Sequence, residues 1–446
     1  MRGFFSLANA TWVASVLATV AAGATIAQPG GIDDIIITAD NILNSTTHYD
    51  LNSDSSSNSP LEVNAVQTAS AALPLSMVNN FNAGMNMYIT GMDGSGTPCF
   101  IGSSGGYVYP NANGASTPKP ITAAIKIALG AKGSTTKFTI PGTLQSARIW
   151  FAKGELKFYT VADANGVSSI VMPSAANPQD PSAGIQWGFI EFNYDGNSIF
   201  ANISYVDFVG LPLGMSITVS DGSQQIVKGL KAQSVESICQ GLIEQTAADG
   251  KIWDKLCTQN NNGNALRVLS PNLYVSANPS AFQTYYADYV NKVWTKYTSQ
   301  ALKIDTQSSA GTVACQVSGS SMTCAGDNRA YPKPTTTDIW GCNSGPFAIQ
   351  SSDNAIHSAV VPRLCAAFER STLLLSGGNV QPSLPAADYY TVNPTNHYSR
   401  IVHEYEVNNI GYAFSYDDVN PKGQNAAGTV SGNNPTLLKV TIGSWS

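Results

Sequence analysis

Short runs rich in β-branched and aromatic residues recur from Leu73 onward at intervals of about ten residues. Gly, Pro and Asp-Gly separate these runs, as expected for turns between short strands. The runs are NMYITGM, GYVYP, TKFTIPG, SARIWFA, LKFYTVA, WGFIEFNYD and NISYVDFVG. This regular spacing predicts an antiparallel β-sandwich or barrel over residues 73–214.

After Gly214 the apolar spacing becomes helical in three segments: SVESICQGLIEQT, NPSAFQTYYADYVNKVWTKY and DNAIHSAVVPRLCAAFERS. In the second segment, Asn278 is the expected N-cap and Pro279 the first helical residue. The third segment contains Pro362, which could kink it. Strand-like pieces, LRVLSPNLYVS and GTVACQV, lie between the helices, so residues 215–390 are predicted to form a mixed α/β domain.

The last part of the chain, residues 391–446, returns to β-type alternation in HYSRIVHEYEVNNIGYAFSYDDVNP and TLLKVTIG. We expect these residues to form strands that rejoin the first sheet. Residues 25–72 include NSDSSSNSP and are expected to be a flexible N-terminal segment. The predicted fold class is therefore α+β.

The N-terminus has the features of a signal peptide over residues 1–24. Arg2 precedes an apolar run that reaches about Val20, and Ala22 and Ala24 fit a cleavage site after Ala24. Ala27 is a nearby alternative cleavage position, and a buried N-terminal helix is the competing interpretation. No later segment has the ~18 apolar residues of a membrane span, and LLKVTIGSWS lacks the apolar tail of a lipid-anchor signal. We therefore expect a secreted, extracellular protein, free or associated with a cell wall.

Cysteine usage also fits an oxidising compartment. Six of the seven cysteines lie in the second half, and pairing sequence neighbours would give Cys239–Cys257, Cys315–Cys324 and Cys342–Cys365. Spacing alone leaves other connectivities open. Cys99 would then be a buried free thiol.

Two classes of ligand are disfavoured by composition. A net charge of −6 without a basic patch argues against nucleic acid. Four histidines and no Cys-x-x-Cys pair argue against a metal site, so no metal and no cofactor is expected. Neutral polymers and small solutes remain as candidate partners.

Two acids, Glu191 and Asp207, stand within GFIEFNYDGNSIFANISYVDFVGLPLG, an aromatic and weakly charged stretch. Asp195-Gly196 is a strong turn signal that would fold this stretch back on itself. A strict two-residue loop there would put the acids on opposite faces of the sheet. The return strand must therefore begin late, near residues 199–202, or bend sharply if the two acids are to meet. We expect their carboxyl carbons within about 10 Å of each other on one concave face.

Paired carboxylates flanked by aromatic residues suit the hydrolysis of a glycosidic bond. One acid with a raised pKa protonates the leaving oxygen, while the other activates water or attacks the sugar. The structural alternatives are an edge-strand charge for Glu191 and a turn cap for Asp207.

Several segments in order resemble secreted glycoside hydrolase family 64, the β-1,3-glucanases with a thaumatin-like β domain. They are NISYVDFVGLPLGMSITV, LRVLSPNLY, DIWGCNSGPFA, VVPRLCAAFERSTLL, NHYSRIVHEY and GYAFSYDDVNP. The resemblance runs from about residue 73 to the C-terminus and is densest over residues 185–446. It implies a thaumatin-like β-sandwich or barrel joined to a mixed α/β domain, with a wide cleft between them.

The resemblance also implies an activity and two roles. Members of this family cleave β-1,3-glucan with inversion and release short laminarioligosaccharides such as the pentamer. By position, Glu191 would be the general acid and Asp207 the general base. Inversion requires a water molecule between the two carboxyl groups and hence a separation of about 6.5–9.5 Å. The expected partner is β-1,3-glucan, bound by a monomer that binds neither nucleic acid nor membrane.

The sequence departs from the related thaumatin-type pattern at Asn202, where that pattern has an Asp. Asn202 also begins a glycosylation sequon, NIS, but a glycan would obstruct a cleft there. Asn44, in NST, is the expected acceptor instead.

Further residues are candidates for binding substrate, each with a structural alternative. Asn193, Asp195 and Ser204 could bind sugar hydroxyls or belong to turns and strand edges. Arg148 could orient a cleft carboxylate or form a surface ion pair. Trp187 and Tyr205 could stack on pyranose rings or lie in the core. Asp417 and Asp418 could deepen the negative potential of the cleft or form a turn.

Two other functions compete with the enzyme. A catalytically inactive thaumatin-like wall protein could bind β-glucan through the same cleft, and a pair of acids placed too far apart would favour it. An osmotin-like membrane-active protein is the third possibility, and the low cationic content argues against it.

Overall fold

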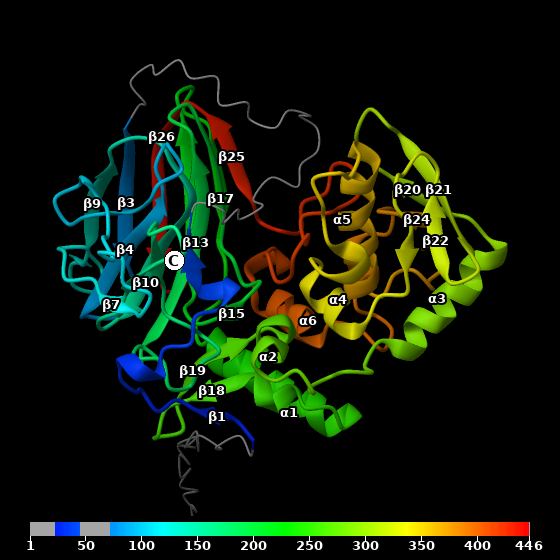
Figure 1. Ribbon diagram of the computed structural model, residues 1–446, viewed down its shortest axis with the longest axis horizontal. Coiled ribbons are helices and arrows are strands. Elements are labelled where there is room, and N and C mark those ends of the chain that lie inside the picture. The colour runs from blue at the N-terminus through cyan, green and yellow to red at the C-terminus, as the bar shows by residue number, and fades with distance from the viewer. Residues whose placement is uncertain (1–22, 45–71, 446) are drawn as a thin grey trace, which may run out of the picture.

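The computed structural model describes residues 23–44 and 72–445. Within these ranges it contains five β-sheets and six α-helices, so the fold is of mixed α+β type (Figure 1). Two large sheets form one half of the molecule, and a smaller sheet with α3, α4 and α5 forms the other (Figure 1). Most of the predicted signal peptide (residues 1–22) and all of residues 45–71 lie outside the described residues.

The largest sheet has eight strands and carries the two acids. Its strands in order are β25 (Val430–Asn433), β14 (Ser198–Asn202), β13 (Gln186–Tyr194), β10 (Leu144–Lys153), β4 (Met85–Met92), β5 (Pro98–Ile101) and β6 (Tyr107–Val108), with β8 (Ile127–Ala128) beside β4. β10 and β13 are central and are buried on both faces over most of their length. Their alternation divides the side chains between two cores: Ile149 and Ile190 enter the larger core, whereas Trp150 and Phe189 enter an aromatic one.

The second large sheet closes the larger core from the other side. Its order is β17 (Gln224–Val227), β16 (Leu213–Val219), β26 (Pro435–Ile442), β3 (Leu73–Asn79) and β9 (Thr135–Ile140). β26 is parallel to β3 and antiparallel to β16. Leu73, Leu75 and Met77 alternate inward from β3, as the period of a half-buried strand requires. The last strands of the chain therefore lie within the sheets formed by its first half.

Three smaller sheets complete the β structure. One contains β1 (Thr25–Ile26), β18 (Cys257–Gln259), β19 (Ala265–Leu269) and β15 (Phe208–Val209). Another contains β2 (Ile42–Leu43), β12 (Ser168–Val171), β11 (Tyr159–Ala162) and β7 (Lys119–Pro120). The third contains β23 (Tyr331–Pro332), β22 (Ser321–Cys324), β21 (Thr312–Ser318), β20 (Leu302–Asp305) and β24 (Val380–Gln381).

The positions of the observed helices agree in part with those predicted from the sequence. They are α1 (Ser234–Asp249), α2 (Pro271–Ala277), α3 (Ala287–Ser299), α4 (Thr336–Gly341), α5 (Ala355–Glu369) and α6 (His397–Tyr405). α1 and α5 lie where helical spacing predicts them, and α5 continues through Pro362. In the described residues no helix is long and apolar enough to cross a membrane.

The predicted start of α3 is wrong by several residues. The helix begins at Ala287, and Asn278 instead ends α2, where its N–H binds the carbonyl oxygens of Tyr274 and Val275. Phe282 has a φ of 54°, in the left-handed region, which interrupts any helix between them. The apolar face predicted for this helix is present within α3, where Tyr289 and Tyr297 are buried.

Two segments expected as strands contain helices. In SPNLYVS, Ser270 accepts a hydrogen bond from the Leu273 N–H and Pro271 occupies the first turn, so α2 begins there. In HYSRIVHEY, the Asn396 side chain caps α6 by accepting from the Ser399 N–H. Local capping by these residues outweighs the β-type alternation of the apolar positions.

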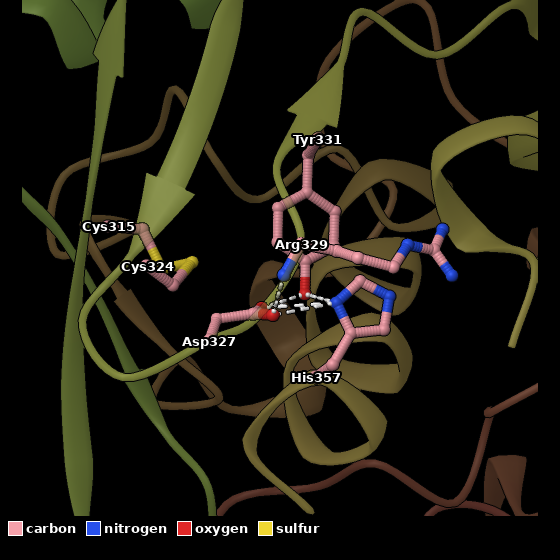
Figure 2. The surroundings of a disulfide bond; sticks show 6 residues. All are labelled: Cys315, Cys324, Asp327, Arg329, Tyr331 and His357. Atoms are coloured by element: carbon pink, nitrogen blue, oxygen red, sulfur yellow. Dashed lines mark hydrogen bonds and ion pairs between the residues drawn. A yellow bond between two sulfur atoms is a disulfide. The ribbon is translucent and has the colours of Figure 1, made fainter. Parts of the chain in front are cut away.

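The disulfides are those expected from pairing sequence neighbours: Cys239–Cys257, Cys315–Cys324 and Cys342–Cys365, with Cys99 free and buried. Figure 2 shows Cys315–Cys324 between β21 and β22, and a buried polar cluster beside it. There Tyr331 donates to Asp327, and the His357 ring lies 2.9 Å from both the Tyr331 hydroxyl and an Asp327 oxygen. The disulfide and the cluster together fix the return from β22 toward β23.

Replacing both Cys315 and Cys324 by Ser should lower the free energy of unfolding by about 2–3 kcal/mol. The reason is that the disulfide closes a short loop in the unfolded chain, with a sequence separation of 9. Urea unfolding measures the loss. Cys99→Ala, which leaves all three disulfides in place, is the control and should cost about 1 kcal/mol. Equal stability of the double variant and the wild type would contradict the expectation.

Candidate functional site

Glu191 lies on β13 directly opposite Arg148 on β10. Both side chains project from the sheet face that carries the aromatic core, next to Trp150 and Phe189. The Arg148 guanidinium lies 4.2 Å from the centre of the Phe189 ring, so an aromatic face supports its charge. Glu191 is 6% exposed and Arg148 is 5% exposed. The acid is thus placed in a largely dry environment next to one fixed positive charge.

Arg148 joins the two acids. Its Nε and Nη2 donate to Glu191 Oε1 over 3.0 and 2.8 Å, and Nη2 also contacts Asp207 Oδ2 at 3.4 Å. Because they contact the same Nη2 atom, Glu191 Oε1 and Asp207 Oδ2 can be no farther apart than the sum of these distances, 2.8 and 3.4 Å. The Asp207 side chain is 22% exposed, against 9% for Glu191, so Asp207 has better access to solvent.

Asp207 reaches this position because the chain leaves the sheet early. β14 ends at Asn202, which pairs with Glu191, and the chain then bends away from the ladder. The Tyr205 N–H binds the Tyr412 carbonyl, and the Asp207 carbonyl accepts from the Ser270 N–H. These anchors return Asp207 toward Arg148. The register problem of a straight hairpin is avoided by a short return strand followed by a bend.

Burial raises the pKa of Glu191, with a further increase from the nearby Asp207 charge, and Arg148 offsets part of this shift. Burial also raises the pKa of Asp207, against the attraction of Arg148. A carboxyl group with a raised pKa retains its proton to higher pH, which a general acid needs. The arrangement can therefore hold one acid protonated while the more exposed one accepts a proton.

Two further groups surround Glu191. The Ser204 hydroxyl hydrogen-bonds to it, and Tyr412 is near enough for the Glu191 charge to raise the pKa of its phenol further, on top of burial. Asn202 is paired with Glu191 in the ladder, so its side chain projects from the same sheet face beside Glu191, and it is 1% exposed. Tyr412 was not anticipated, because it is remote in sequence from the strand that carries Glu191.

Asp418 lies on the far side of Tyr412, whose hydroxyl contacts it at 3.3 Å. Burial raises the pKa of Asp418 to about 7. Asp417, its neighbour, points elsewhere and is 1% exposed. It forms ion pairs of 2.8 Å with Arg370 and 2.9 Å with His403 inside the protein. Of the two acids, Asp418 is the one that hydrogen-bonds to Tyr412.

The raised pKa of Asp418 predicts a pH dependence of stability. An acid whose folded pKa exceeds its unfolded value stabilises the fold at low pH, and that contribution is lost as pH rises from about 4 to about 7. Asp418→Asn should abolish this loss, so the variant should gain stability relative to wild type as pH rises. Urea unfolding at pH 4 and pH 8 measures the difference, and the exposed Asp33→Asn is the control. A constant difference between the two pH values would contradict the expectation.

Four other candidates have structural partners away from the two acids. Asn193 Oδ1 accepts from the Ser146 N–H, at the bulge in β10. Asp195 is exposed and caps the hairpin turn by accepting from the N–H groups of Asn197 and Ser198. Trp187 and Tyr205 are 1% and 2% exposed and pack in the cores, where a sugar ring has no access to them.

Asp40 is a second residue that the sequence analysis did not identify. Its carboxylate hydrogen-bonds with Thr38 and Ser276 and lies close enough to Asp207 and Arg148 for their charges to interact. Nothing in the sequence near Asp40 distinguishes it from other acids of the N-terminal segment. Among the described residues there is no cluster of three or more His, Cys, Asp or Glu that could hold a metal ion.

Comparisons with known proteins identify the family to which the chain is similar. Residues 71–442 match the model of a β-1,3-glucanase family, glycoside hydrolase family 64. Glucan endo-1,3-β-glucosidases of Cellulosimicrobium cellulans and Arthrobacter sp. (strain YCWD3) are each 25% identical, over 285 and 281 residues. Each alignment covers 61% of this chain and 48% of the relative, so the chain spans about half the length of these relatives.

Solved structures of similar proteins show the same fold. A laminaripentaose-producing β-1,3-glucanase in complex with laminaritetraose superimposes with a TM-score of 0.72 at 25% identity, covering 84% of this chain and 99% of that one. A β-1,3-glucanase domain from Clostridium beijerinckii gives a TM-score of 0.66 at 20% identity, with the same coverage. Both neighbours correspond almost completely to a part of the present chain.

Proposed function

Because the chain belongs to the glycoside hydrolase family 64 β-1,3-glucanases, we propose that it hydrolyses β-1,3-glucan with Glu191 as general acid and Asp207 as general base. The observation that carries this proposal is the contact of both carboxylates with one buried arginine. The activity in the names of the curated relatives supports the same substrate. Short laminarioligosaccharides are the proposed products.

The contacts of the two acids support the assignment of the general-acid role to Glu191 and of the general-base role to Asp207. Two Arg148 hydrogen bonds reach Glu191 Oε1, and we propose that Oε2 carries the proton for the glycosidic oxygen. When Glu191 gives up this proton, its new negative charge is stabilised by the adjacent guanidinium. Asp207 takes a proton from the water that attacks the anomeric carbon. Arg148 contacts both acids, and the proposed reaction inverts the anomeric carbon through a water molecule held at Asp207.

The residues around Glu191 and the two halves of the fold are also part of this proposal. Ser204 hydrogen-bonds to Glu191, Asn202 lies opposite Glu191 in the ladder, and Asp418 contacts the Tyr412 hydroxyl. We propose that residues 73–214 and the strands of residues 391–446 form a thaumatin-like β domain, with residues 215–390 as the mixed α/β domain and a wide glucan cleft between them. The three disulfides support secretion, and we propose that the enzyme acts as an extracellular monomer.

Hydrolysis of laminarin and curdlan, with sizing of the released sugars, tests the proposed function. Wild-type protein should release short laminarioligosaccharides, and the α-anomer should appear first in NMR spectra if the reaction inverts the β-linkage. Binding of glucan without release of sugar would instead identify a glucan-binding wall protein. Initial release of the β-anomer would keep the enzyme but reject inversion.

A further inference from the structure

Residues 23–44 precede the part of the chain that matches the family model, which begins at residue 71. They nevertheless lie along the folded domain, shown in blue in Figure 1 close to β15 and α2. At one end β1 pairs in parallel with β18, and the Ala27 N–H binds the Gln259 carbonyl over 2.8 Å. At the other end β2 pairs with β12. This N-terminal segment is thus attached at both ends by β-ladders.

The attachment includes a hydrophobic anchor. Leu43 is 0% exposed and belongs to the aromatic core that also contains Trp150 and Phe189, beneath the Arg148 side chain. The Met172 N–H binds the Asn41 carbonyl over 2.8 Å. A loosely associated tail would not bury a leucine in the core that supports Arg148. The segment is therefore a permanent part of the site's surroundings.

A compact turn before this anchor presents Asp40. The Asn41 side chain is 2% exposed and accepts from the Thr38 N–H at 2.7 Å while donating to the Ile36 carbonyl at 3.0 Å. This fixes the backbone on both sides of Asp40. The Asp40 carboxylate hydrogen-bonds to the hydroxyl of Ser276, at the end of α2, and is only partly buried. Its orientation is therefore held by both the segment and the domain.

We propose that Asp40 is a glucan-binding residue of this site, which the N-terminal segment adds beside Asp207 to determine how the sugar next to the catalytic base is held. The inference rests on the proposed function, since it presumes a glucan at the two acids. Carboxylates accept strong hydrogen bonds from sugar hydroxyls, and a partly exposed one fixed on two sides loses little freedom when it does so. Burial and the nearby Asp207 charge raise the pKa of Asp40, as expected for an acid that shares a site with another acid.

The test measures glucan binding separately from catalysis. In a Glu191→Gln background, calorimetry with laminaritetraose gives the affinity without turnover. Adding Asp40→Ala should weaken binding about tenfold or more, the loss typical of a hydrogen bond to a charged group. Asp40→Asn should lie between the two, because an amide still accepts one hydrogen bond from Ser276 or from the sugar. Asp33→Ala, an exposed acid of the same segment, is the matched control and should bind as the parent does.

Steady-state kinetics on laminarin provide the second measurement. In the otherwise wild-type enzyme, Asp40→Ala should raise KM about tenfold and change kcat less, with an unchanged melting temperature. Parental affinity and KM in Asp40→Ala would overturn the inference. It would also fail if Asp40→Ala lowered the melting temperature while Asp40→Asn bound normally, because the role would then be structural. Absence of any binding by the parent would overturn it as well.

The two proposals fail in different ways. If the wild type releases no sugar but the affinity still depends on Asp40, hydrolysis is rejected and the binding residue stands. If the wild type hydrolyses laminarin and Asp40 has no effect on affinity or KM, only the role of Asp40 is rejected.

Discussion

Glu191→Gln should lower kcat on laminarin about a thousandfold, within the range that general acid–base catalysis contributes. Gln has the shape of Glu and can still accept the two Arg148 hydrogen bonds, but its amide cannot protonate the leaving oxygen. Asp207→Asn should have an effect of similar size, since an amide cannot accept a proton from water. Reducing-sugar assays measure kcat, and calorimetry with laminaritetraose should show that both variants still bind.

The control for these variants is Asp195→Asn on the same hairpin. Asp195 caps the turn after β13 and has no contact with Arg148 among its hydrogen bonds. Its variant should keep near-normal kcat. Near-normal activity in either Glu191→Gln or Asp207→Asn would reject that residue's role, while leaving the hydrolase itself in place.

Asp417→Ala should cost about 3–5 kcal/mol of stability, the effect of removing one partner from a buried ion pair. Asp417 is 1% exposed and its carboxylate pairs with both Arg370 and His403, while His403 also pairs with Glu406 at 3.0 Å. Without Asp417, the Arg370 guanidinium loses its carboxylate partner inside the protein. Chemical unfolding at neutral pH measures the loss.

The adjacent Asp418→Asn is the matched comparison, because Asp418 has no ion pair among its described contacts and its ionised form is disfavoured by burial. At neutral pH that variant should be at least as stable as wild type. A loss below about 1 kcal/mol in Asp417→Ala would mean that the buried charges are satisfied without it.

Much of the fold follows from local patterns in the sequence. The long strands β10 and β13 coincide with SARIWFA and WGFIEFNYD, and α1 coincides with its amphipathic segment. Sequence-adjacent cysteines form all three disulfides. These features depend on residues close in sequence, where periodicity and spacing carry the information.

The incorrect or missing predictions concern helices whose start is set by a capping side chain and site residues that are brought in by contacts distant in sequence. α2 and α6 are capped by the side chains of Ser270 and Asn396, within segments whose β-like alternation predicts strands. The Ser-Pro pair at Ser270 is a signal that could have identified α2. In the site, Glu191 and Asp207 were identifiable from their neighbours, whereas Tyr412 and Asp40 enter only through tertiary contacts. No local pattern marks such residues.

The position of β26 has a consequence for how the protein is made. β26 lies between β3 and β16, so the strand at residues 73–79 has its parallel partner at residues 438–442. The second large sheet cannot close until residues 438–442 have left the ribosome. Non-local pairing of this kind is slow, because the loop between the partners must be closed first. We therefore expect the β half to complete folding only after residues 438–442 have been synthesised.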